Sequence, residues 1–121
     1  MRVALDAMGG DEAPHAVISG ADISKGQYPH IQMIFFGDEA RIRPLLKQTT
    51  HLADAEIVHT LDAVSADDTA SQAVRRGKTT SMWLAIAAVA AGEADAVVSA
   101  GNTGALMAMS KLQLRTMPGV T

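Results

Sequence analysis

Cysteine is absent from this chain of 121 residues, and aromatic residues make up only 3% of it. A chain without thiols has no disulfide, no thiolate-ligated zinc and no cysteine nucleophile. So few aromatic side chains provide no evident platform for stacking nucleic-acid bases. Lys and Arg number 10 against 13 Asp and Glu, and the resulting formal net charge of −3 argues against nucleic acid as a partner.

Long hydrophobic runs are also missing. The longest run, residues 82–91, is about half of the ~20 residues that a membrane span needs, and it is predicted as a buried helix. Asp6 and Asp11 interrupt the N-terminal segment, which therefore does not resemble a signal peptide. The histidines show no metal-ligand spacing, so no metal site is expected. No cofactor is expected either. A hydrophobic content of 48% is typical of a soluble globular protein, and the absence of cysteine is compatible with the cytosol.

Strand and helix signals alternate along the chain. Strands are predicted over residues 3–6, 31–36, 56–59 and 95–99, and helices over 14–25, from 38 onward, 69–76, 80–91 and 102–114. Pro44 predicts a kink or a restart in the second helix. Because the strands are apolar throughout, they indicate βαβ units and a parallel sheet covered on both faces.

Four strands in an open sheet would leave long unprotected edges. Residues 117–121 read as a loop with no element after it. Residues 1–121 are therefore predicted to be the N-terminal portion of a larger α/β domain. The alternative is a small, complete four-stranded domain.

The stretch from Ser99 to Met107 follows the fourth predicted strand and opens the last predicted helix. A helix start presents unpaired N–H groups and the positive end of the helix dipole, so it favours an anion. Four strand-to-helix loops are predicted at one sheet edge, and this one alone contains no Asp or Glu. It is therefore the preferred phosphate site, with a plain capped turn as the alternative. Its candidate ligands are Ser99, Gly101, Asn102, Thr103 and Gly104.

Two further segments could contribute to such a site. Asp6 and Asp11 flank the flexible pair Gly9 and Gly10, and could orient a substrate or hold a cation; helix capping by Asp11 is the alternative. The basic turn at residues 75–78 precedes a helix, and Lys78 is its best candidate for phosphate. A solvated charged turn is the alternative for this cluster.

Three motifs in this chain resemble those of the bacterial acyl-acyl carrier protein:phosphate acyltransferases of phospholipid synthesis. They are Asp6-Ala7-Met8-Gly9-Gly10-Asp11, Thr80-Ser81-Met82, where the family usually has Ser-Ser-Met, and the stretch from Ala94 to Met107. Residues 118–120 look like the start of a further family motif. Family members are much longer, so the resemblance covers about their first third.

The resemblance implies that inorganic phosphate attacks the thioester of a long-chain acyl-acyl carrier protein, giving acyl phosphate and free carrier. It also implies a three-layer α/β/α fold similar to phosphate acetyltransferases and isopropylmalate dehydrogenases, a homodimer, and a cytoplasmic enzyme peripherally associated with the membrane. The alternatives are a short-chain phosphate acyltransferase or a decarboxylating dehydrogenase of that fold, or a non-catalytic binding module. The segment alone is expected to be inactive.

Phosphate is itself the nucleophile in this reaction, so the protein must supply positioning and charge stabilisation. Backbone N–H groups at residues 102–104, with the side chains of Ser99 and Asn102, are predicted to hold phosphate or the developing oxyanion. Asn102 and Lys78 are the candidate catalytic residues. The remaining candidates are predicted to shape the neighbouring loops: Asp6, Gly9, Gly10, Asp11 and Ser81.

Overall fold

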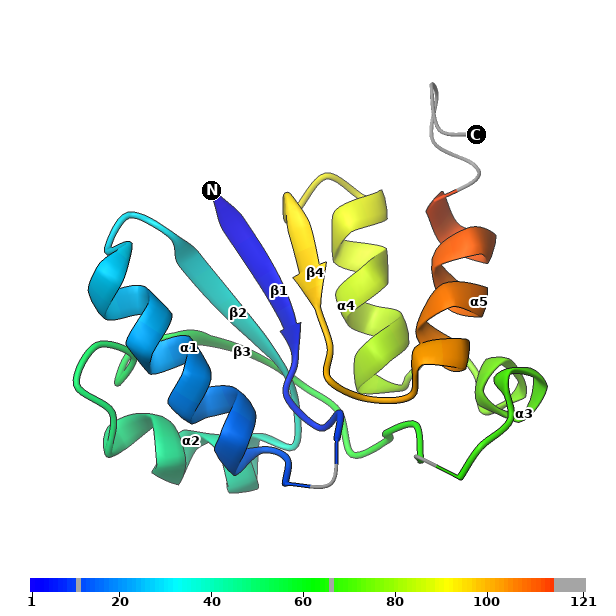
Figure 1. Cartoon of the computed structure of the whole chain (residues 1–121), viewed down its shortest axis with the longest axis horizontal. Helices are drawn as coiled ribbons and strands as arrows, with labels where there is room; N and C mark the ends of the chain where they lie inside the picture. The colour runs from blue at the N-terminus through cyan, green and yellow to red at the C-terminus, as the bar shows by residue number, and fades with distance from the viewer. Residues whose placement is uncertain (11, 66, 115–121) are drawn as a thin grey trace.

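A parallel four-stranded sheet forms the centre of the molecule (Figure 1). The computed structural model describes residues 1–10, 12–65 and 67–114. The strands are β1 (Arg2–Asp6), β2 (Gln32–Gly37), β3 (Glu56–His59) and β4 (Ala96–Val98), in the spatial order β3-β2-β1-β4. β1 pairs in parallel with β2 on one side and with β4 on the other. The parallel α/β class predicted from the apolar strands is confirmed.

Helices cover both faces of this sheet. The helices are α1 (His15–Gln27), α2 (Glu39–Lys47), α3 (Ala70–Arg75), α4 (Ser81–Ala90) and α5 (Thr103–Leu114). On one face α1 and α2 bury Ile18, Ile42 and Leu46 against side chains that include Leu5 and Phe35. Figure 1 shows these two helices on one side of the strands and α4 with α5 on the other. The result is a three-layer arrangement.

The opposite face is covered by α4, the helix predicted from residues 82–91. Ala85 and Ala88 pack on Ala4, Ile34 and Phe36 of the sheet. A second row on α4, which includes Met82 and Ile86, packs against Ala105 and Met109 of α5 and against α3. In the part of the chain that the structure describes, no helix has the length and apolar character needed to cross a membrane.

Two expectations about local structure need correction. The restart predicted at Pro44 does not occur, because α2 continues from Glu39 to Lys47. A proline removes one N–H and so one backbone hydrogen bond. Buried Ile42 and Leu46 anchor the helix on either side of it. β4 is also shorter than predicted and ends at Val98, and the Ser99 hydroxyl that follows it donates a hydrogen bond to Asp6 at the end of β1. The motif predicted at residues 118–120 lies outside the described residues.

Candidate functional site

The carboxyl ends of β1, β3 and β4 bring their following loops to one edge of the sheet (Figure 1). This is the edge at which open parallel sheets bind ligands. The start of α4 lies at the same edge, where Ser81 donates a hydrogen bond to Asp6 at the end of β1. Segments separated by up to 93 residues in the sequence thus meet at one place.

Asp6 is the centre of this meeting point. Side chains alternate along a strand, and Ala4 packs towards α4, so Asp6 also faces the α4 side. Its carboxyl accepts hydrogen bonds from Ser81 Oγ at 2.6 Å and from Ser99 Oγ at 3.0 Å. The backbone N–H of Met8 donates to it as well, at 3.2 Å. Asp6 is only 2% exposed, so these bonds satisfy a carboxyl that water does not reach freely.

Gly9 and Gly10 allow the loop after β1 to touch the turn after β4. A Cβ at Gly9 would lie 2.8 Å from Ser99 Oγ and 2.9 Å from the Gly101 nitrogen. Gly10 has φ of +96°, a conformation that favours glycine, and faces the Ala100 carbonyl. These contacts place the predicted loop residues Asp6, Gly9, Gly10 and Ser81 beside the β4–α5 turn. Asp11 lies outside the described residues.

Asn102 fastens the start of α5. Its Oδ1 accepts the Ala105 N–H at 3.0 Å, which satisfies one of the free donors of the first turn. Its Nδ2 donates to the Asp68 carbonyl at 2.6 Å and to the Ser65 carbonyl at 3.3 Å. The side chain therefore caps one helix and ties it to the loop before α3. Nothing in the sequence indicated this tie between Asn102 and the loop before α3.

The side-chain donors of Ser99 and Asn102, which were predicted to hold an anion, are thus used within the protein. The single hydroxyl proton of Ser99 goes to Asp6, and its oxygen accepts the Gly101 N–H at 3.2 Å. Both Nδ2 protons of Asn102 are directed at carbonyls. What remains are backbone N–H groups of the first helical turn, which have no intrahelical partner. Exposed Gly104 provides one of them, and Thr103 is the first residue of the helix.

The expectation that no carboxylate lies near this turn is wrong. The turn contains no acid in its own sequence, but Asp6 from β1 is bonded to Ser99. The first turn of α5 nevertheless has no acidic residue. Because Asp6 is buried and bonded to Ser99, it does not occupy the N–H groups of this first turn, and a helix start with free N–H groups favours an anion.

Lys78 lies in the turn between α3 and α4, at the same edge of the sheet. Thr79 Oγ1 donates to Asp62 at 2.5 Å, and the Ser81 N–H donates to the Asp62 carbonyl at 2.9 Å, so this turn is fixed to the loop after β3. Lys78 itself is exposed, and no hydrogen bond or ion pair joins its ammonium to a described residue. Its charge is available to a ligand.

An ion pair holds the loop that Asn102 contacts. Arg76 donates from Nε to one Asp68 carboxylate oxygen at 2.7 Å and from Nη2 to the other at 3.1 Å. The hydrogen bonds from the Arg76 guanidinium and then from the Ser65 N–H lower the pKa of Asp68. The same pairing with Asp68 raises the pKa of Arg76. The pair therefore fixes the carbonyls to which Asn102 donates.

Asp68→Asn is expected to destabilise the protein in a pH-dependent way. The pKa of Asp68 is lower in the folded state than the ordinary value of about 3.9, so its contribution is complete above that value. The contribution is lost as the pH falls through the folded pKa. Unfolding free energies of wild type and variant should therefore differ at pH 7 and converge once the pH lies below the folded-state pKa of Asp68. When Arg76 is replaced by Gln, Asp68→Asn should change the unfolding free energy little at any pH. A large change in that background would mean that the ion pair with Arg76 is not the source of the effect.

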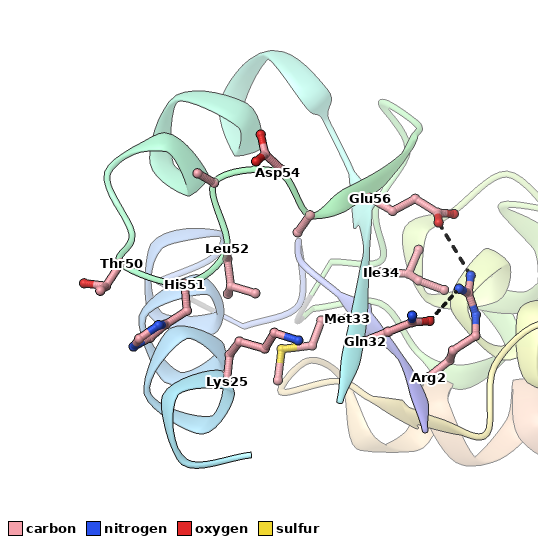
Figure 2. Close-up of a pocket in the computed structure, with 12 residues that line it drawn as sticks. Arg2, Lys25, Gln32, Met33, Ile34, Thr50, His51, Leu52, Asp54 and Glu56 are labelled. Carbon is pink, nitrogen blue, oxygen red and sulfur yellow. Dashed lines mark hydrogen bonds and ion pairs between the residues drawn. The ribbon is translucent and has the colours of Figure 1, made fainter. Parts of the chain in front are cut away.

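A cavity of about 490 Å³ lies at the opposite edge of the sheet (Figure 2). Its lining includes Arg2, Gln32 and Glu56, the first residues of β1, β2 and β3. Arg2 bonds Gln32 at 3.0 Å and Glu56 at 3.5 Å, and Lys25 donates to the Pro29 and Ile31 carbonyls. Arg2 and Lys25 are thus engaged with the protein's own groups, unlike Lys78 at the carboxyl edge.

No group of three His, Asp or Glu side chains that could hold a metal ion occurs among residues 1–10, 12–65 and 67–114. The donors at the carboxyl edge are hydroxyls, amides and backbone N–H groups. Such donors suit an anion better than a cation.

Comparison with known proteins gives a consistent result. A family model described as "Fatty acid synthesis protein" matches residues 1–121. A phosphate acyltransferase of Parvibaculum lavamentivorans is 58% identical over 122 residues, which cover 99% of this chain and 34% of that protein. A phosphate acyltransferase of Rhodospirillum centenum is 57% identical over 119 residues, covering 98% of this chain and 34% of that protein. The chain thus spans about a third of the length of these curated relatives.

Proposed function

The chain belongs to the fatty acid synthesis protein family, and from this membership we propose that a full-length protein carrying it transfers an acyl group to inorganic phosphate. The names of its relatives, which are phosphate acyltransferases at up to 58% identity, support this activity. In the reaction a phosphate oxygen attacks the thioester carbonyl carbon, and a tetrahedral oxyanion forms. The carbon–sulfur bond then breaks, the sulfur takes up a proton, and an acyl phosphate is released.

The β4–α5 turn is the phosphate site in this proposal. The observation that carries it is the first turn of α5, where Gly104 is an exposed residue and no acidic residue occurs. Backbone N–H groups at a helix start bind phosphate without any charged side chain. Lys78 adds positive charge from the neighbouring turn and helps to attract the dianion. Asn102 positions the backbone and does not itself donate to phosphate.

The remaining features of the proposed enzyme concern its donor and its location. The acyl donor is an acyl-acyl carrier protein, and the product enters phospholipid synthesis. The protein acts without a cofactor, as a homodimer in the cytoplasm that associates peripherally with the membrane. The motifs at residues 6–11, 80–82 and 94–107 support these proposals through their resemblance to acyltransferases that act on carrier-bound acyl groups.

Gly104→Ala is expected to weaken phosphate binding without affecting the fold. An added Cβ would meet Asn102 Oδ1 at 3.5 Å and Ala70 at 3.9 Å, which are ordinary contacts. It would also cover the N–H groups that phosphate approaches. The phosphate KM of the full-length enzyme should rise about tenfold, or about 1.4 kcal/mol, while the thioester KM stays unchanged and the melting temperature does not fall.

The assay is formation of acyl phosphate from phosphate and an acyl thioester without nicotinamide. Gly20→Ala is the matched control, because a Cβ there meets nothing within 4 Å and the residue lies in α1. An unchanged phosphate KM in Gly104→Ala would exclude the turn as the phosphate site. Nicotinamide reduction in place of acyl phosphate formation would favour the dehydrogenase alternative.

A further inference from the structure

The buried carboxyl of Asp6 joins three segments that the proposed reaction needs in fixed positions. One oxygen accepts from Ser81, the first residue of α4, and from the Met8 N–H of its own loop. The other oxygen accepts from Ser99, the first residue after β4. In Figure 1 the end of β1, the start of α4 and the β4–α5 turn meet below the sheet. No other described carboxyl is as buried as this one.

The bond to Ser99 extends into the backbone of the turn. A hydroxyl has one proton and accepts through its oxygen. Ser99 gives its proton to Asp6 and accepts the Gly101 N–H at 3.2 Å. The two hydrogen bonds that link Asp6, Ser99 and Gly101 therefore fix the backbone immediately before the N–H groups of residues 102–104.

We infer that Asp6 is a positioning residue for phosphate, acting through Ser99 on the β4–α5 turn. This inference rests on the proposed function. Asp6 does not touch phosphate, because its carboxyl is buried and bonded within the protein. It sets where the turn's N–H groups lie, and small displacements of binding groups cost much of the rate that positioning provides.

The chemistry of the position requires a carboxyl. Two hydroxyls and one N–H donate to Asp6, so every group around it is a donor. An Asn side chain has nearly the same shape but replaces one acceptor oxygen with an NH₂ group that donates. Asp6→Asn therefore keeps the volume of the side chain but places a donor where at least one hydrogen bond needs an acceptor. Where the NH₂ group faces Ser99, the hydroxyl proton is released from its position beneath the turn.

The experiment is a double-mutant cycle in the full-length enzyme, with Asp6→Asn, Ser99→Ala and the double variant. Each single variant should raise the phosphate KM about tenfold, and the double variant should raise it no further, because both remove the same connection. The kcat at saturating phosphate should change less than the KM. Ser81→Ala is the matched variant on the other carboxyl oxygen, and it should lower the melting temperature with a smaller effect on the phosphate KM.

Other outcomes overturn the inference. If the two effects multiply, Asp6 does not act through Ser99. If Asp6→Asn lowers the melting temperature but leaves the phosphate KM unchanged, the role of Asp6 is only structural. Should Asp6→Asn fail to fold, the phosphate KM of Ser99→Ala alone decides between the two roles. If Gly104→Ala raises the phosphate KM but Asp6→Asn and Ser99→Ala do not, this inference fails and the proposed site remains. If Gly104→Ala has no effect, the proposed site itself fails.

Discussion

Gly9→Ala is expected to lower the free energy of unfolding by about 2 kcal/mol, the usual cost of forcing an extra carbon into a packed site. The added Cβ would lie 2.8 Å from Ser99 Oγ, 2.9 Å from the Gly101 nitrogen and 3.0 Å from Asp6 Oδ2. One of these is a backbone atom, so a side-chain rotation does not relieve the clash. The loop after β1 and the β4–α5 turn must move apart.

The same displacement should reduce activity. The Gly101 N–H immediately precedes the groups assigned to phosphate, so kcat/KM of the full-length enzyme should fall about a hundredfold. Denaturant unfolding and the acyl phosphate assay measure the two effects. Gly20→Ala is the control: it lies in α1 with open space around it, and should stabilise the helix by up to about 1 kcal/mol. Equal stability of the two variants would mean that the loops do not need this close contact.

Much of the fold was accessible from the sequence because the signals that define it are local. Apolar runs such as the one at residues 31–36 predicted a buried strand, and the structure has β2 at Gln32–Gly37. Thr80 begins α4 as a capping residue whose side chain accepts from Trp83 N, as its position before an apolar run indicates. The restart predicted at Pro44 was wrong, because the effect of a proline depends on whether neighbouring side chains anchor the helix. That anchoring is a tertiary property.

The candidate site was only partly accessible. The sequence predicted that the turn at residues 99–104 lies at the carboxyl edge of the sheet, because it directly follows a predicted strand. It did not reveal that Asp6 reaches Ser99 across 93 residues, or that Asn102 donates to carbonyls 34 and 37 residues before it. Such pairings depend on strand order, and β4 lies beside β1 although two strands and four helices separate them in sequence. A local count of acidic residues therefore did not reveal the carboxyl of Asp6 that lies beside this turn.

Asn102→Ala is expected to lower the free energy of unfolding by about 2–3 kcal/mol. Loss of a helix cap costs about 1 kcal/mol, and each lost hydrogen bond to a carbonyl costs a further ~1 kcal/mol. The cap is the bond from Ala105 N to Oδ1, and the other two bonds run from Nδ2 to Ser65 and Asp68. Denaturant unfolding of the full-length protein measures the loss. Reduced activity of this variant would not by itself identify a phosphate ligand, because the turn loses its support.

Asn102→Ser separates these contributions. Serine caps a helix about as well as asparagine but has no NH₂ group to reach the loop before α3. It should therefore be about 1 kcal/mol more stable than Asn102→Ala. If backbone N–H groups bind phosphate, the phosphate KM should follow the support of the turn and rise less for Ser than for Ala. If both substitutions raise the KM equally despite their different stabilities, the Asn102 amide contacts phosphate directly. Its bonds to Ser65 and Asp68 would then have to break on binding.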